Sequence, residues 1–318
     1  MAIKARRISL RGARGQGARS VQRAGGDDNR SEVTSRMEDT KQRVRDFYDE
    51  IGWRQDAEGL YHNARYEDLR PVSREYIHKC HLRVNRHIAS TGNLLLDAGS
   101  GPVQWPEYLT YSAGYRFRVC ADISITALKA ARSVVGERGL YVLADIVHLP
   151  FQSNAFDAVV SIHAIHHLPL EEHKTAYLEF RRVLRPGGAA ATVCGWYRPL
   201  LVRVTDPLIQ LGRIFAGRER KRKKDWATDQ DGQGTFVQKM TPRWLKSELT
   251  GAVEYDMFAW RSLSPRFMQW FIRPATGGAT WLRLIFWLEE RFPRFFGEHG
   301  QYPLIVLHKN GNGVSKPH

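Results

Sequence analysis

The sequence lacks long apolar runs and has few cysteines. No stretch of 18 uncharged apolar residues occurs in its 318 residues, so a membrane-spanning helix is not expected. The three cysteines, Cys80, Cys120 and Cys194, lie far apart and form no C-x-x-C pair. This spacing argues against a zinc cluster and predicts buried, reduced thiols in a reducing compartment. We therefore expect a cytoplasmic protein without a bound metal.

Acidic residues are fewer than basic ones, but the imbalance is local. The chain has 48 Lys and Arg against 33 Asp and Glu, a net charge of +15. Residues 1–30 carry +6 of it and the segment GRERKRKK, residues 217–224, carries +5, so the other residues carry only +4. Residues 1–36 also have no apolar periodicity, which predicts a disordered basic tail. The body of the protein is therefore only mildly basic.

Beyond the tail, the apolar pattern predicts an α/β domain preceded by a helical cap. The cap, residues 37–92, is expected to hold one helix from Met37 to about Gly52 and a second over residues 72–89. Strands that are apolar on both faces then alternate with helices, which is typical of a mostly parallel sheet covered on both sides. Seven strands are expected, at residues 93–97, 115–121, 141–143, 156–162, 189–194, 253–260 and 302–308. The predicted domain covers residues 93–318, with helical insertions at 197–240 and 264–300.

A glycine turn follows the first expected strand. The segment LLLDAGSGP, residues 94–102, places Gly99 and Gly101 at the carboxyl edge of that strand, where open α/β sheets bind ligands. The third small residue of a dinucleotide fingerprint is absent, because Val103 is followed by Gln104, and no Walker loop is present. The turn therefore allows a close approach of the backbone to a ligand but lacks the parts that bind phosphates.

Two further carboxylates follow the next two strands. Asp122 lies 21 positions after Gly101, a spacing at which a carboxylate can accept hydrogen bonds from both ribose hydroxyls. Asp145 can accept from an adenine amino group while Ile146 packs on the ring. Together with Asp97, these residues predict a site for an adenosine without phosphates that carries a positively charged group.

Five segments resemble the class I S-adenosylmethionine-dependent methyltransferases in order and spacing. They are LLLDAGSGP (94–102), VCADIS (119–124), LADIVHLPF (143–151), FDAVVSIHAIHHL (156–168) and RRVLRPGG (181–188). The branch that they resemble is the small-molecule one, the type 11 and quinone-methylating enzymes, with one departure at Val103, where the family often has a third glycine. The resemblance implies a Rossmann-like fold with an N-terminal helical lid and S-adenosylmethionine as cofactor. It also implies cofactor contacts by Asp97, Gly99, Ser100, Gly101, Asp122, Ile123, Asp145, Ile146 and Ser161.

The histidines that follow the fourth expected strand are the candidate general bases. Methyl transfer requires an aligned nucleophile, exclusion of water and, for some acceptors, removal of a proton. His163, at the carboxyl end of the strand, is the first candidate and His166 the second, because imidazole titrates near neutral pH. In the alternative interpretation these side chains only pack or cap the next helix, and proximity alone drives the transfer.

The same loop argues for a small acceptor. It lacks the Asn/Asp-Pro-Pro-aromatic motif of exocyclic amino methylases and the acidic ligands of the metal-dependent catechol enzymes, and no cysteine in the chain follows a proline. We expect a small apolar or aromatic acceptor, and a nucleic acid is disfavoured. Two other functions stay open: an RNA methyltransferase that uses the basic tail and loop, and a non-catalytic protein that binds S-adenosylmethionine.

Two segments outside the strand pattern have alternative interpretations. Phe47, Tyr48 and Trp53 resemble the lid of the small-molecule branch, or they form an ordinary aromatic packing face. Residues 198–216 predict an amphipathic helix whose basic continuation suits an anionic membrane surface. We prefer the alternative, a helix packed on the domain and followed by a solvated basic loop.

Overall fold

The computed structural model describes residues 26–215, 227–228 and 234–310. Residues 1–25 of the expected tail and the basic run 217–224 lie outside the described residues. The chain divides between Glu38 and Asp39 into two units, and the second unit holds both the cap and the sheet. Among the described residues, no helix has the length and apolar character needed to cross a membrane.

The first helix begins earlier than expected. Helix α1 spans Gly26–Phe47, and a π-helical turn follows over Tyr48–Gly52. The expected start at Met37 and the extension of the disordered tail to residue 36 are therefore wrong. Residues 27–36 contain neither glycine nor proline and begin with two aspartates, which suit the positive end of a helix dipole. The sequence between Gly26 and Met37 thus contains no residue that would prevent a helix.

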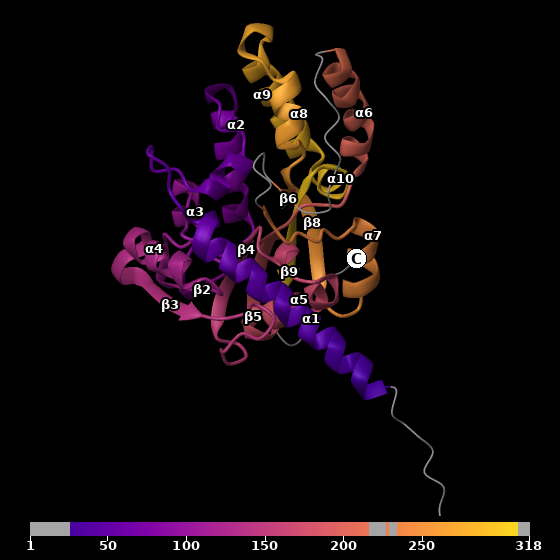
Figure 1. Cartoon of the computed structure of the whole chain (residues 1–318). Coiled ribbons are helices and arrows are strands. Elements are labelled where there is room, and N and C mark those ends of the chain that lie inside the picture. The colour runs from indigo at the N-terminus through magenta and orange to yellow at the C-terminus, as the bar shows by residue number, and fades with distance from the viewer. Residues whose placement is uncertain (1–25, 216–226, 229–233, 311–318) are drawn as a thin grey trace, which may run out of the picture. The chain divides into compact units, whose positions relative to one another are not determined.

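A seven-stranded sheet forms the centre of the second unit (Figure 1). The strand order is β3-β2-β1-β4-β5-β9-β8, with parallel pairing from β3 to β5, and β9 is antiparallel to both of its neighbours. The predicted mostly parallel sheet of seven strands is confirmed. The strands are β1 Gly92–Ala98, β2 Tyr115–Asp122, β3 Gly139–Leu143, β4 Phe156–Ile162, β5 Leu184–Val193, β8 Glu254–Arg261 and β9 Tyr302–His308.

Helices connect the strands largely where the sequence predicts them. Thr241 caps α7 by accepting a hydrogen bond from the Trp244 amide at 3.1 Å, with proline at the first helical position. Strand β5 already begins at Leu184, five residues before the expected start, so the segment Arg185–Gly188 is part of the strand. The helices are α2 Pro71–Leu82, α3 Pro106–Thr110, α4 Ile125–Val135, α5 Leu170–Val183, α6 Leu200–Phe215, α7 Pro242–Leu249, α8 Pro265–Phe271, α9 Gly278–Arg291 and α10 Pro293–His299; a small hairpin pairs β6 Ala227–Thr228 with β7 Gly234–Thr235.

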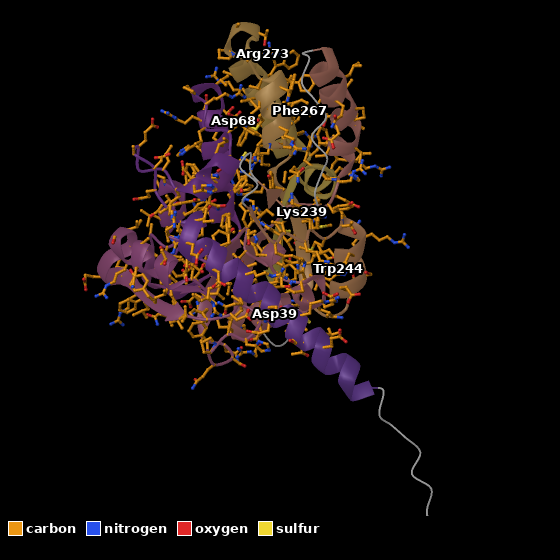
Figure 2. All side chains as sticks on the ribbon, in the orientation of Figure 1. Asp39, Asp68, Lys239, Trp244, Phe267 and Arg273 are labelled. Carbon is orange, nitrogen blue, oxygen red and sulfur yellow. The ribbon has the colours of Figure 1, made fainter. Side chains whose placement is uncertain are left out.

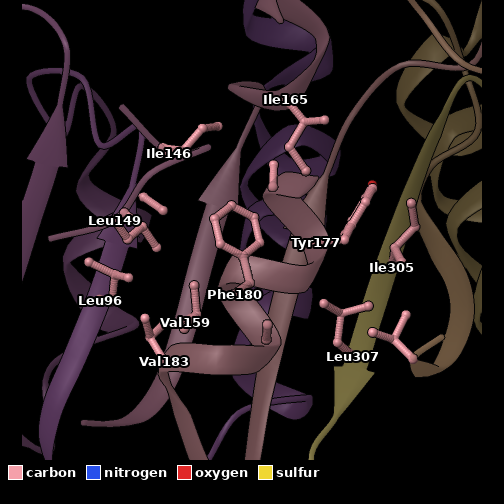
Figure 3. Packing of buried hydrophobic residues seen from close by; sticks show 14 of the residues in the cluster. Leu96, Ile146, Leu149, Val159, Ile165, Tyr177, Phe180, Val183, Ile305 and Leu307 are labelled. Carbon is pink, nitrogen blue, oxygen red and sulfur yellow. The ribbon is translucent and has the colours of Figure 1, made fainter. Parts of the chain in front are cut away.

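Alternate residues of each strand fill a core on each face of the sheet. Leu96, Val159 and Ile305 pack with Phe180 of α5 on one face (Figure 3). Their immediate neighbours in the chain, such as Leu95 and Val160, pack against α3 and α4 on the other face. Burying each such aliphatic side chain contributes roughly 1.5–3 kcal/mol. All three cysteines are buried and free, as predicted.

Both insertions leave the sheet at the edge where the parallel strands end. Helix α6 follows β5, and α8 follows β8, which runs parallel to β5 because β9 is antiparallel to both. In Figure 1, α6, α8 and α9 lie together at the top of the view, beyond this end of the sheet. The insertions therefore stand over the carboxyl edge at which a ligand site is expected.

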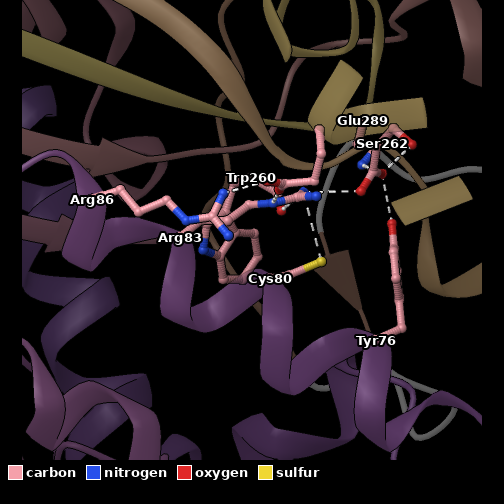
Figure 4. Close-up of polar contacts among 8 residues, drawn as sticks. Tyr76, Cys80, Arg83, Arg86, Trp260, Ser262 and Glu289 are labelled. Carbon is pink, nitrogen blue, oxygen red and sulfur yellow. Dashed lines mark hydrogen bonds and ion pairs between the residues drawn. The ribbon is translucent and has the colours of Figure 1, made fainter. Parts of the chain in front are cut away.

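A buried charge network ties α9 to α2 and β8. Glu289 of α9 is 1% exposed and accepts hydrogen bonds from the Tyr76 hydroxyl at 2.7 Å and from the Ser262 amide at 2.8 Å. The Arg83 guanidinium donates to Glu289 at 2.9 Å and to the Trp260 carbonyl at 2.8 Å (Figure 4). Because these partners come from three distant segments, the network fixes the second insertion, residues 264–300, on the domain.

Candidate functional site

The glycine turn after β1 has the backbone that only glycine adopts readily. Gly99 and Gly101 have φ angles of +71° and +53°. A Cβ on Gly99 would lie 2.3 Å from the Cβ of Ala164, so no side chain fits there. The Gly101 amide donates to Oδ2 of Asp122 at 2.8 Å, which ties the turn to the end of β2. Ser100 completes the turn, and its amide donates to the Ala121 carbonyl at 3.2 Å.

Val103 keeps the turn in a glycine-like conformation despite its side chain. Its φ angle is 55°, in the left-handed region, and it is 3% exposed. A β-branched residue rarely adopts this conformation, so the position stores backbone strain. The departure from the family pattern that the sequence indicated therefore leaves the path of the chain intact.

Hydrogen bonds from two backbone amides fix the carboxylate of Asp122 at the end of β2. It is 8% exposed, and its Oδ1 accepts from the Ser124 amide at 2.9 Å. Burial, together with the charges of Asp97 and Asp49, raises the pKa of Asp122 to about 6 against the lowering effect of the Ser124 and Gly101 amides. Backbone amides fix both carboxylate oxygens, whose remaining lone pairs suit a ligand that brings hydroxyl donors.

Asp97 takes part in an ion pair that the sequence analysis did not foresee. The carboxylate is 4% exposed, and Nε of Arg118 reaches its Oδ2 at 3.1 Å, with Nη2 on the same oxygen. Arg118 also donates to the Tyr108 carbonyl at 2.6 Å. The signal in the sequence was an arginine in the middle of an apolar strand, which needs a buried partner. Asp97 therefore presents a largely balanced charge to the site.

Asp145 contacts a lysine of the N-terminal segment. Its Oδ1 accepts from the Val147 amide at 2.9 Å, and its Oδ2 pairs with Nζ of Lys41 at 2.8 Å. Lys41 also pairs with Glu172 at 3.0 Å. The sequence analysis missed Lys41, because nothing local marks a lysine on a helix as a partner of a residue 104 positions away. Ile146, next to Asp145, is 6% exposed and belongs to the core.

Residues 39–53 lie over the ends of several strands, as a lid does. Phe47 and Tyr48 form an apolar cluster with Val44, against which Ile123 and Trp53 pack. The Tyr48 hydroxyl is 2.8 Å from Nε2 of His167. The Trp53 ring lies so close to the glycine turn that a Cβ on Gly101 would be 3.0 Å from it, and Asp49 accepts from the Ser124 hydroxyl. The lid and the predicted cofactor residues therefore share one edge of the sheet.

Several buried polar atoms around this edge have no hydrogen-bond partner among the described residues. They include Oγ of Ser161, Oε1 of Gln104, Nε1 of Trp53 and Nδ1 of His166. Each buried polar atom left unpaired costs about 1–3 kcal/mol. Such atoms suit a polar ligand, and Gln104 and Trp53 were not predicted as ligand contacts. The donors, acceptors and close backbone approach thus fit an adenosyl group.

His163 directly follows β4 and turns toward the C-terminal strands. Its φ angle is +61°, and its amide donates to the Val193 carbonyl at 2.8 Å. The imidazole centroid lies 5.1 Å from that of Trp260 and 5.3 Å from that of Tyr302. Burial, together with the charges of Arg261, His81 and Lys239, lowers the pKa of His163 to about 3 against the raising effect of Glu67. The side chain is therefore neutral at pH 7 and carries one unprotonated ring nitrogen.

His166 and His167 face different surroundings. The His166 ring is 5.7 Å from that of His163 and 4.4 Å from that of His167, and burial lowers its pKa well below the usual value. His167 contacts Tyr48 and the Phe236 carbonyl, and burial lowers its pKa to about 4. The charge of Lys239 lowers the pKa of both, and Lys239 is marked in Figure 2. Of the two predicted candidates, His163 is the one whose ring contacts Trp260 of β8 and Tyr302 of β9.

The buried histidines should make stability depend on pH. His173 is fully buried, and burial lowers its pKa to about 4, whereas an unfolded chain protonates histidine near pH 6.5. Between these values the unfolded state binds the extra proton, so stability falls as pH drops from about 6.5 to 4. We expect His173→Gln to remove on the order of 2 kcal/mol of this fall, measured by urea unfolding at several pH values. His148→Gln, at an exposed histidine, is the control for the loss of an imidazole as such.

Comparison with known proteins identifies the family of the segment that forms this edge of the sheet. Residues 96–192 match a family model described as a methyltransferase domain. This part of the chain is a class I methyltransferase domain. The match runs from within β1 to within β5 and so contains the glycine turn, Asp122, Asp145 and the candidate histidines. The family uses S-adenosylmethionine, which the unpaired polar atoms and the glycine turn described above fit.

Relatives of the methyltransferase domain have different acceptors. The chain is 34% identical over 107 residues to methyltransferase GfsG of Streptomyces halstedii, covering 32% of this chain and 37% of that protein. It is 32% identical to the tRNA (carboxymethyluridine(34)-5-O)-methyltransferase of Arabidopsis thaliana, covering 37% of this chain and 32% of the relative. It is 28% identical to sterol 24-C-methyltransferase ERG6B of Gibberella zeae, covering 51% and 40%. The chain thus spans about a third of the length of the first two of these relatives.

Proposed function

We propose that this chain transfers the methyl group of S-adenosylmethionine to a small apolar or aromatic acceptor that lies against His163. The observation that carries the proposal is the neutral imidazole of His163, placed between the end of β4 and the rings of Trp260 and Tyr302. Aromatic walls favour an apolar or planar acceptor, and the uncharged imidazole has an unprotonated ring nitrogen that can face the acceptor's proton. Asp122 and the glycine turn lie at the same edge of the sheet, so cofactor and acceptor can meet there.

In the proposed reaction, one group of residues would bind the cofactor and another residue would remove a proton from the acceptor. When bound, S-adenosylmethionine supplies a methyl group activated by its sulfonium. Asp122 would accept the ribose hydroxyls and Asp145 the adenine amino group, with Ile123 and Ile146 beside the ring and Ser161 as a polar contact. A ring nitrogen of His163 would take the proton that the acceptor loses on methylation. Alignment of the two reactants supplies the rest of the rate.

Asp122→Asn should weaken cofactor binding without unfolding the domain. A hydrogen bond to a charged group is worth about 1.5–3 kcal/mol, so the dissociation constant should rise about ten- to hundredfold. Isothermal titration calorimetry with S-adenosylmethionine and its demethylated product measures this directly.

Asp157 provides a matched control at the opposite edge of the sheet. It is 4% exposed and, like Asp122, accepts from two backbone amides, those of Asn93 and Leu94, at 2.5 and 2.7 Å. Asp157→Asn should lower the melting temperature and leave the dissociation constant unchanged. An equal loss of affinity in both variants would mean that general destabilisation causes the effect and would contradict the proposal that Asp122 binds the ribose.

The tRNA-modifying relative favours a second candidate, methyl transfer to RNA. The two candidates differ in where a labelled methyl group goes. A cell extract incubated with the enzyme and S-[methyl-³H]adenosylmethionine should yield label in the organic-solvent extract under the first proposal. Label in precipitated tRNA would support the second instead, together with RNA binding that weakens steeply as salt rises. Cofactor binding with label in neither fraction would point to a non-catalytic protein.

A further inference from the structure

Helix α6 turns an apolar face to solvent. Leu200, Val204, Leu208 and Leu211 are 45%, 61%, 54% and 51% exposed, and their spacing places them on one side of the helix. Ile209, which points the other way, is 4% exposed. The preferred expectation for this segment, an amphipathic helix packed by its apolar side on the domain, is therefore wrong for this face. A soluble surface helix normally shows the reverse pattern.

The neighbouring helices of the second insertion expose large apolar side chains as well. Phe271 at the end of α8 is 42% exposed, and on α9 Trp281, Leu284 and Trp287 are 56%, 44% and 58% exposed. Helix α6 contacts α8, and the labels of Phe267 and Arg273 in Figure 2 mark the α8–α9 hairpin beside α6. Contiguous apolar patches of this kind are rare on monomeric proteins and indicate an interaction surface.

The exposed charges on these segments are almost all positive. Where the structure describes side chains of the two insertions, residues 197–211, 235–240 and 264–300, the exposed charged side chains are arginines apart from Glu290, which pairs with Arg83 and Arg86. Two of these arginines, Arg283 and Arg294, pair with Glu75 and Asp256, so their charge is partly balanced. Guanidinium groups bind phosphate in a bidentate manner, and aromatic rings such as indole prefer the boundary between water and lipid. The arginines are Arg198, Arg203, Arg266, Arg273, Arg283, Arg291 and Arg294.

We propose that the surface formed by α6 and the α8–α9 hairpin binds the anionic phospholipid surface of a membrane. The aliphatic stripe and the tryptophans enter the headgroup region, and the arginines meet the lipid phosphates. An RNA would use the arginines but would leave the aliphatic stripe of α6 in water, so lipid accounts for both features. The inference stands on exposure and charge alone and does not depend on the chemistry proposed for His163.

Sedimentation with phospholipid vesicles tests the proposal on the full chain. The protein should sediment with vesicles of phosphatidylcholine and phosphatidylglycerol, and less with pure phosphatidylcholine or at high salt. Val204→Asp combined with Leu208→Asp should reduce the partition coefficient about tenfold or more, because two apolar side chains are replaced by charges that anionic lipid repels. Arg203→Gln combined with Arg273→Gln should reduce it on anionic vesicles and leave the weak binding to neutral vesicles unchanged.

A matched control variant distinguishes lipid binding by this surface from non-specific binding of exposed apolar side chains. Val134 of α4 and Leu178 of α5 are 42% and 38% exposed and lie on helices outside the two insertions. Val134→Asp combined with Leu178→Asp should bind vesicles as the wild type does, and all variants should keep the wild-type melting temperature within a few degrees. Failure of the wild type to sediment, or equal losses in control and test variants, would overturn the proposal. So would tRNA binding that displaces the vesicles while the α6 variant binds lipid normally, which would assign the surface to RNA.

Discussion

His163→Ala should lower the turnover number about a hundredfold or more while the affinity for S-adenosylmethionine barely changes. A positioned general base contributes about 10²–10⁴ to a rate, and His163 faces Trp260 and Tyr302 rather than the glycine turn. The measurement is turnover with the acceptor under saturating cofactor, beside calorimetry of cofactor binding. Because the pKa of His163 is lowered to about 3, the wild-type rate should show no fall due to this group between pH 8 and 5.

His166→Ala is the companion variant, since its ring is 5.7 Å from that of His163. If the base is His163, the His166 variant should lose much less turnover. A His163→Ala variant that loses cofactor affinity and turnover in equal measure would make His163 a wall of the cofactor site. A variant that loses neither would mean that proximity alone drives the transfer.

Glu289→Ala should lower the free energy of unfolding by about 3–5 kcal/mol. Arg83 is 3% exposed and donates to Glu289 at 2.9 Å, so the variant leaves a guanidinium buried without one of its carboxylates. The hydroxyl of Tyr76 and the amide of Ser262 lose the same acceptor. Unfolding in urea, followed by circular dichroism, gives the change.

Glu290 serves as the control for Glu289, because it pairs with Arg83 at 2.8 Å but keeps a side chain that is 32% exposed. Pairs near solvent contribute about 0–1 kcal/mol, so Glu290→Ala should cost far less than Glu289→Ala. Equal costs for the two substitutions would contradict the view that burial of the network, rather than the number of ion pairs, fixes α9.

The sheet could be predicted from the sequence because a strand that is buried on both faces has apolar residues at successive positions. Strands such as β4 and β9 are apolar at successive positions, and their expected bounds are those observed. The start of α1 could not be predicted in this way, because residues 26–36 carry no apolar stripe and a helix there shows only as the absence of helix breakers. The direction in which α6 faces was also hidden, because its pattern is the same whether the apolar side is covered or exposed.

In the candidate site, too, some residues could be placed from the sequence and others could not. Asp122 and Gly101 could be placed together because both lie at the ends of adjacent parallel strands, and their hydrogen bond of 2.8 Å agrees with that. The partners of Asp97 and Asp145 could not be predicted, since Arg118 and Lys41 carry no local mark of the carboxylate that they approach. Long-range ion pairs of this kind depend on how the elements pack, which periodicity does not encode.

The order of strands in the sheet has a consequence for how this protein could diversify. The match to the methyltransferase domain ends at residue 192, within β5, whereas β8, β9 and both insertions come later in the chain. The glycine turn and Asp122 are thus encoded before residue 193, and the aromatic rings of Trp260 and Tyr302 after it. Recombination or loop exchange beyond β5 would replace the walls around His163 while the register of β1 to β5 stays the same. Under the proposed function, a chimera that joins residues 1–193 to the C-terminal strands of another such domain should shift its acceptor preference toward that of the second parent.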